Sequence, residues 1–285
     1  MLMSHRNLWW HLRMLLLRAW RAILRPDVRA KALQLGLEAA ERHDRMAFSR
    51  AMLLVGDLSG WDAPTQAVAA LANHDVGKKE EASRLIAEAW RKAPEDATVL
   101  MCQGRLLHQD GRSQEAVEAL NKSLRLKPGD PWILGWLGAA NLGVGNLDES
   151  RKCYLDCLDK HPSPDTRGWV YSGLGHLAAR HEDWRAAADY WRKAAAILPD
   201  EEEIAYNLGD ALLELGQYQD AIRTLNRNLR LGCANPAWTY FDLARCYQLL
   251  GDLDRARSYS DLVLRYAPDD QNALTLKKEL SDANV

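Results

Sequence analysis

A regular spacing of prolines constrains this chain of 285 residues more than any other feature of its sequence. Pro94, Pro128 and Pro162 recur at one constant interval, which is about 34 residues long. Pro199 follows slightly later than a further copy of the interval would place it, and Pro268 comes about two intervals after Pro199. A repeat of this length predicts a row of similar structural units rather than one globular core.

Each period is typical of two amphipathic helices joined by a tight turn. Apolar residues recur at steps of three and four in VLMCQGRLL (99–107) and AVEALNKSLRL (116–126). Small residues recur at fixed places before each proline, as in Gly104, Gly111 and Ala116. The first Gly allows the two helices to approach closely, the second Gly allows the turn, and the proline ends the second helix.

Acidic residues after the prolines, such as Asp96, Asp130 and Asp200, are placed to start the next helix. We count seven repeats, beginning near Arg29, Ala63, Ala97, Pro131, Gly168, Glu202 and Ala237.

This spacing resembles that of the tetratricopeptide repeat family. The clearest copies are LLHQDGRSQEAVEALNKSLRLKP (106–128), LLELGQYQDAIRTLNRNLRL (212–231) and YQLLGDLDRARSYSDLVLRYAP (247–268). The resemblance covers residues 29–270 and implies an all-α, right-handed superhelical solenoid of about seven helix-turn-helix repeats. Residues 1–28 are then expected to form a basic N-terminal helix that caps the solenoid, and residues 271–285 a C-terminal capping helix and tail.

Composition argues against several other classes of protein. A formal net charge of -2 is unlike that of a general nucleic-acid binder, which needs a concentrated basic surface. The five cysteines are an odd number without a C-x-x-C pair, so we expect a reducing compartment, the cytoplasm. Charges interrupt every apolar window of about 20 residues, and the start lacks a cleavage-site pattern. We therefore expect neither a spanning helix nor a secretory signal, and at most peripheral contact with a membrane.

Catalytic chemistry has little support in the sequence. The segment HDVGK (74–78) resembles part of the signature of metal-dependent HD phosphohydrolases, but Gly77 falls where each repeat turns. Cys153, Cys157 and His161 share one helical face and could approach a metal, although buried core cysteines are the favoured interpretation. We therefore expect no enzyme, cofactor or metal site, and keep a hydrolase embedded in the repeats only as a third hypothesis.

The resemblance implies that partners bind along the first helices of the repeats. The expected groove residues are Met101, Arg105, His108, Trp132, Trp136, Trp169, His176, Arg180, Tyr206, Asp210, Trp238, Phe241 and Arg245, with Asn207, Glu214 and Asp242 on the same helix faces. Aromatic rings and arginines suit a peptide or helix with apolar anchors and some acidic character. The alternative is that several of these rings pack between helices. The Lys and Asn pairs with which one subfamily holds acidic chaperone tails are absent here, which disfavours that function.

The N-terminal segment LWWHLRMLLLRAWRAILRPD (8–27) is amphipathic and strongly basic. Residues 1–29 contain six arginines and one acid, so this end is near +5 and the remainder near -7. Pro26 lies two repeat intervals before Pro94, which favours a lid on the first full repeat. A membrane-surface helix and a helix for a partner or for self-association remain alternatives, using Trp9, Arg13, Arg18, Trp20, Arg21 and Arg25. The leading functional hypothesis is a non-catalytic scaffold or adaptor, and the second is a membrane-recruited assembly factor.

Overall fold

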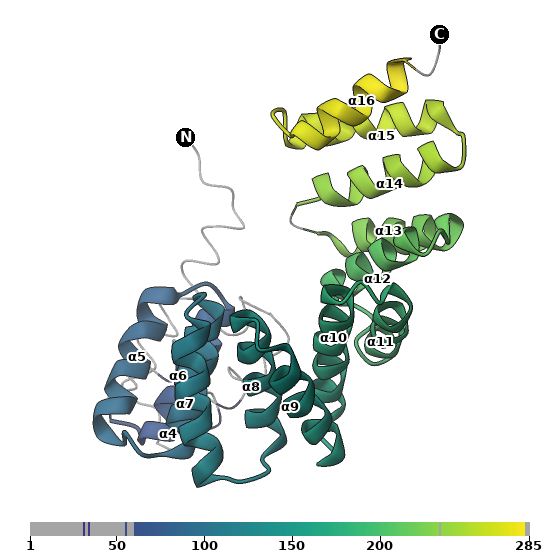
Figure 1. The fold of residues 1–285 in the computed structure, drawn as a ribbon. Coiled ribbons are helices and arrows are strands. Elements are labelled where there is room, and N and C mark those ends of the chain that lie inside the picture. Colours follow the sequence, from purple (N-terminus) through teal and green to yellow (C-terminus); the bar gives the residue numbers. More distant parts are fainter. Residues whose placement is uncertain (1–30, 32–33, 35–54, 56–59, 234, 283–285) are drawn as a thin grey trace, which may run out of the picture. The chain divides into compact units, whose positions relative to one another are not determined.

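The computed structural model describes residues 31, 34, 55, 60–233 and 235–282, and these residues form helices joined by short turns, without strands (Figure 1). The chain divides into two compact units, Met1–Gly145 and Asn146–Val285. The prediction of an all-helical repeat protein is confirmed for this part of the chain. The N-terminal segment and nearly all of the predicted first repeat lie outside the described residues.

In the part that the structure describes, the first unit contains two complete helix pairs and one further helix. Its helices are α4 (Ala63–Asp75), α5 (Lys79–Lys92), α6 (Ala97–Gln109), α7 (Ser113–Leu126) and α8 (Pro131–Val144). The closest packing joins α4 with α5 and α6 with α7, and α6 also contacts α4 and α8. The first helices of successive repeats therefore lie side by side in this unit.

The described part of the second unit begins with a single helix and continues with three helix pairs and a final helix. Its helices are α9 (Leu147–Asp159), α10 (Pro164–Arg180), α11 (Trp184–Ile197), α12 (Glu202–Glu214), α13 (Tyr218–Leu231), α14 (Ala237–Leu249), α15 (Leu253–Tyr266) and α16 (Gln271–Asp282). Leu276 and Leu280 of α16 are buried in a cluster with Ala244, Tyr247 and Ala256. This packing is compatible with a terminal cap, which stays a prediction.

The predicted repeat boundaries can be compared with the helix starts at six positions. Five first helices begin at the predicted residue, and the sixth, α10, begins at Pro164 rather than Gly168. The Ser163 hydroxyl accepts a hydrogen bond from the Thr166 amide, and Pro164 occupies the first turn, where its missing N–H is no loss. The segment SPD (163–165), which is an insertion relative to the other repeats, therefore caps and lengthens this helix.

Aspartates start several helices, as the sequence indicated. One carboxylate oxygen of Asp96 accepts from the amides of Thr98 and Val99, and Asp130 caps α8 in the same way. Asp200 was predicted to act similarly, and this prediction is wrong. The cap position of α12 is Glu201, which makes no capping bond with its side chain.

Glycines mark the points where the two helices of a repeat approach most closely. A Cβ atom added at Gly104, Gly175 or Gly209 would lie 2.6–2.7 Å from a large side chain of the second helix, which is Leu120, Trp191 or Leu225 respectively. A residue with any side chain at these glycines would therefore push the two helices apart.

The turn between the two helices also depends on glycine. The second glycine of the repeat adopts a left-handed backbone, with φ between 72° and 82° at Gly77, Gly111, Gly216 and Gly251. Glu182 holds the same position after α10 with φ 57°, so this turn carries strain that glycine avoids.

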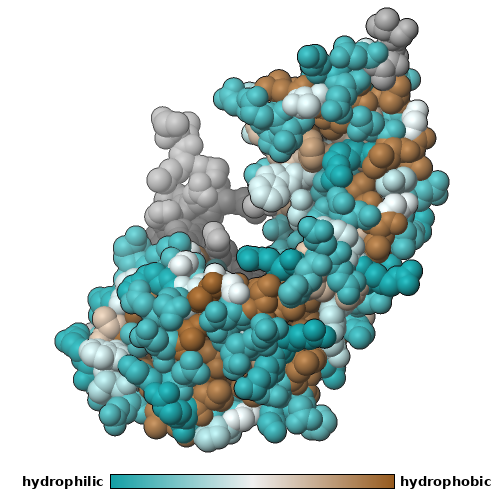
Figure 2. Space-filling view, in the orientation of Figure 1, coloured by the Kyte–Doolittle hydropathy of each residue, from teal (hydrophilic) through white to brown (hydrophobic). Residues whose placement is uncertain are grey.

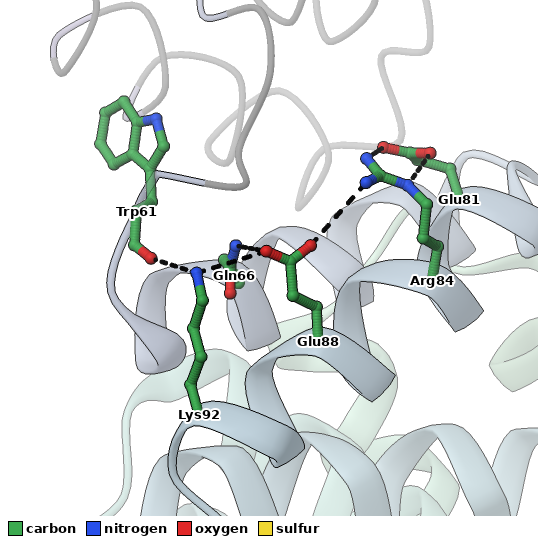
Figure 3. A network of polar contacts seen from close by, with 6 residues as sticks. All are labelled: Trp61, Gln66, Glu81, Arg84, Glu88 and Lys92. Carbon is green, nitrogen blue, oxygen red and sulfur yellow. Dashed lines mark hydrogen bonds and ion pairs between the residues drawn. The ribbon is translucent and has the colours of Figure 1, made fainter.

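A polar network joins α4 to α5 in the first described repeat (Figure 3). The buried Gln66 amide donates to Glu88 Oε1 at 3.1 Å, and Lys92 Nζ lies 3.3 Å from the same oxygen. Lys92 Nζ also donates to the Trp61 carbonyl oxygen at 3.0 Å. The hydrogen bond from Gln66 and the charge of Lys92 lower the pKa of Glu88. The network fixes the two helices of this repeat at one end.

Candidate functional site

Arg105 and Trp136 form the centre of the candidate surface in the first unit. The Arg105 guanidinium carbon lies 4.8 Å from the Trp136 ring centroid, and Nη2 lies 2.7 Å from both carboxylate oxygens of Asp75. The centroids of the His108 and Trp136 rings lie 6.3 Å apart. The structure therefore brings three predicted residues together, but Arg105 is already neutralised by Asp75, a partner that the sequence did not suggest.

The segment HDVGK has structural contacts instead of a catalytic arrangement. Asp75 pairs with Arg105, His74 Nε2 lies 3.6 Å from Asp110 Oδ1, and Gly77 makes the left-handed turn. The first two contacts join successive repeats. In the part of the chain that the structure describes, no three His, Cys, Asp or Glu side chains come close enough to hold a metal ion.

Two of the predicted groove residues pack toward the core. Met101 is only 4% exposed, so its prediction as a surface residue is wrong. Phe241 is half-buried and packs against the clusters formed by α14, α15 and α16. In contrast, Trp132 at the start of α8 is 41% exposed. Position on a first helix therefore does not by itself distinguish surface from core.

Large aromatic side chains are exposed on α10 and α14 in the second unit. Trp169 is 44% and Trp238 65% exposed. Tyr206 on α12 is half-buried, and its ring centroid lies 6.5 Å from that of Trp238. Figure 2 shows apolar residues at the surface of both units among mostly hydrophilic ones. Rings of this size, left in contact with water, are typical of binding surfaces.

His176 links α10 to α12 and also covers a buried ring. His176 Nε2 lies 3.5 Å from Glu203 Oε1 and 3.4 Å from Asn207 Nδ2. Its ring meets the Trp191 ring edge to face, with centroids 5.3 Å apart. The hydrogen bond from His176 lowers the pKa of Glu203.

Trp191 itself was not among the predicted residues. Its place after Gly175 matches the place of the buried Leu120 after Gly104, and this equivalence could have indicated a buried ring. Arg180, which was predicted to line the groove, is exposed at the end of α10.

Carboxyl groups gather where α12 meets α14. Arg245 Nη1 donates to Glu214 Oε1 at 3.1 Å, and Asp210 and Asp242 lie within electrostatic reach of this pair. Asp242 is 4% exposed, and burial together with the charge of Asp210 raises its pKa to about 7. Burial and the charge of Glu214 also raise the pKa of Asp210. This surface is acidic despite the presence of Arg245.

The predicted residues of the basic N-terminal segment, Trp9 to Arg25, lie outside the described residues. Their role as a lid, a membrane-surface helix or a partner helix stays a prediction. Among the helices that the structure describes, none is both long and apolar enough to cross a bilayer.

Family models described as tetratricopeptide repeat match residues 66–131 and 200–269. These two ranges contain the three copies quoted above. They correspond to the helices α4–α7 and α12–α15.

Curated relatives match over part of the chain. Cellulose synthase operon protein C of Pseudomonas fluorescens (strain SBW25) is 26% identical over 200 residues, which are 68% of this chain and 16% of that protein. BBSome complex member BBS4 of Bos taurus is 29% identical over 132 residues, which are 46% of this chain and 24% of that protein. The chain thus spans less than a quarter of the length of either relative.

Solved structures share the fold. The structure of Pseudomonas aeruginosa pilF has a TM-score of 0.66 and 18% identity, covering 76% of this chain and 97% of that one. YrrB, described as a TPR protein with an unusual peptide-binding site, has a TM-score of 0.55 and 18% identity, covering 68% and 97%. The repeat spacing, the paired helices and the family models agree: residues 66–131 and 200–269 belong to the tetratricopeptide repeat family.

Proposed function

We propose that this protein is a non-catalytic scaffold or adaptor that binds a segment of a partner protein on the first helices of its repeats. The observation that carries the proposal is the exposure of Trp169 and Trp238 on first helices of the second unit. Exposed indoles are unfavourable in water and contribute strongly when a partner covers them. The adjacent Tyr206 extends the same apolar surface.

Two comparisons support an interaction role. YrrB is described by its peptide-binding site, and BBS4 is named as a member of a complex. Both likenesses are distant, so the identity of this chain's partner does not follow from them. The proposal depends on the exposed rings.

Truncating both indoles, Trp169→Ala with Trp238→Ala, should weaken partner binding by at least roughly tenfold, because each hot-spot truncation costs about 1–2 kcal/mol. The measurement is affinity purification from the native host with quantitative mass spectrometry. Trp90→Ala is the matched control, since Trp90 is 45% exposed but lies on the second helix α5. Unchanged recovery of every partner by the double variant would refute the proposal.

A second candidate function is that of a membrane-recruited assembly factor. It is favoured by the six arginines among residues 1–29, interleaved with Trp and Leu. Removing residues 1–25 should then lower co-sedimentation with liposomes that contain an anionic lipid, with little change for neutral liposomes. Equal sedimentation of the full and shortened chains would eliminate the lipid role and leave the scaffold proposal intact.

A further inference from the structure

Two neighbouring helices of the second unit each carry an aromatic ring followed one turn later by an aspartate. On α12, Tyr206 is followed one turn later by Asp210 and another turn later by Glu214. On α14, Trp238 is followed one turn later by Asp242 and then by Arg245. We call these six residues the α12/α14 face. Each helix thus places an aromatic ring beside a carboxyl group, and the two rings lie 6.5 Å apart between centroids.

The α12/α14 face has too little positive charge for its carboxyl groups. Within the described part of the chain, Arg245 is the cation that acts on Asp210 and Asp242, and it already donates to Glu214 at 3.1 Å. Three carboxyl groups therefore share one guanidinium. Like charges at this spacing repel one another, and a further cation would relieve that repulsion.

Asp242 gives an independent sign of a missing partner. Its side chain is 4% exposed, and its Oδ2 atom is buried without a hydrogen-bond partner among the described residues. A buried carboxylate oxygen normally has a donor or a counter-charge, because leaving it without one costs free energy. Burial and the charge of Asp210 raise the pKa of Asp242, so the surroundings of this carboxyl group disfavour its ionised form.

The aromatic rings add a second attraction for a cation. Trp238 is 65% exposed, so its indole is open to a ligand. A lysine ammonium or an arginine guanidinium over an indole gains a cation–π interaction, and the same group would lie near Asp210 and Glu214. The stem of such a side chain is apolar and can cover Tyr206.

We propose that the α12/α14 face binds a lysine or arginine side chain of the partner segment, with an adjacent apolar side chain resting on Trp238 and Tyr206. This inference rests on the proposed scaffold function and names the chemistry of its partner. The sequence suggested a partner with some acidic character, and the proposal replaces it with a basic one. The reason is that Arg105 and Arg245 are already paired with Asp75 and Glu214.

The carboxyl groups of Asp210 and Glu214 contact the bound cation directly, and the buried Asp242 contributes through its charge. Asp210 is half-buried and the Glu214 side chain is 32% exposed, so both are accessible. The groups that face Asp242 are Tyr206, Asp210 and Glu214 on α12 and Arg245 and Cys246 on α14. A bound cation favours the ionised form of Asp242, so binding should strengthen as the pH rises from about 6 to 8.

The test uses the full chain and three fluorescein-labelled peptides that share leucine anchors and differ in carrying lysine, glutamine or glutamate between them. Fluorescence anisotropy at about 50 mM salt should show the highest affinity for the lysine peptide. Asp210→Asn with Glu214→Gln should weaken binding of the lysine peptide by roughly tenfold, about 1.4 kcal/mol. The affinity for the glutamine peptide should not change. The substitutions reduce the repulsion among the carboxyl groups, and a glutamine amide oxygen can still accept from Arg245, so the fold should persist, which circular dichroism checks.

The matched control is Asp189→Asn with Asp254→Asn, which changes net charge equally on the second helices α11 and α15. Equal losses in the two double variants would overturn the proposal, because the effect would then be general electrostatics. Equal or tighter binding of the glutamate peptide would overturn it as well. If Trp238→Ala still weakens binding of the glutamine peptide in that case, the scaffold function stands. Only the proposed preference for a basic partner side chain then fails.

Discussion

Replacing Trp191 with alanine should lower the free energy of unfolding by about 3–5 kcal/mol. The side chain is 2% exposed and fills the space beside Gly175, where its ring atoms lie 2.7 Å from the position of an added Cβ. Its indole Nε1 has no hydrogen-bond partner among the described residues, so the loss is one of packing and apolar burial. Urea denaturation followed by circular dichroism measures the change.

Trp238→Ala is the control, because it removes the same atoms from a side chain that is 65% exposed. This substitution should change the free energy of unfolding by no more than about 0.5 kcal/mol. Similar losses in the two variants would contradict the division of the tryptophans into core and surface. That division is the basis of the proposed binding surface.

Asp242→Asn should stabilise the protein increasingly as the pH rises. The pKa of Asp242 is raised from 3.8 to about 7 in the folded state, so between these values the folded chain holds a proton that the unfolded chain has lost. The stability of the natural protein therefore falls as the pH rises through this window and levels off above about 7. Asparagine does not ionise, so the variant does not lose this stability as the pH rises.

From pH 5 to pH 8 the advantage of Asp242→Asn should grow by about 3 kcal/mol, since about two pH units of the window each contribute about 1.4 kcal/mol. Urea denaturation at both pH values measures the growth. Asp254→Asn, at a side chain that is 98% exposed, should show no such growth. An advantage of Asp242→Asn that is independent of pH would mean that this carboxyl group is not held protonated by its surroundings.

The repeat boundaries were predictable because local chemistry sets them. Proline, glycine and capping aspartate act within a few residues, and five first helices begin where the spacing placed them. The start of α10 was missed because Ser163 and Pro164, within an insertion, also form an effective helix start. Local chemistry therefore predicts the repeat boundaries, and the one boundary that was missed lies where an insertion contains its own capping signal.

The candidate site was harder to predict because it depends on contacts between repeats. Arg105 looked available for an acidic partner, but Asp75 of the preceding repeat occupies it. Met101 shares a helix with Arg105 yet is buried, while Trp238 is open. Helical periodicity places a residue on one side of its helix but does not reveal how far the next repeat covers that side.

The local packing within each unit also bears on how quickly the protein reaches its native state. Helices meet mainly their neighbours in the chain, and the side-chain bonds between successive first helices join residues one repeat apart, such as Arg105 with Asp75 and Arg245 with Glu214. Closing loops of that length requires little chain entropy compared with the long-range pairings of a sheet. Folding can therefore nucleate in any well-packed helix pair and spread to its neighbours, and a damaged repeat need not prevent the others from forming.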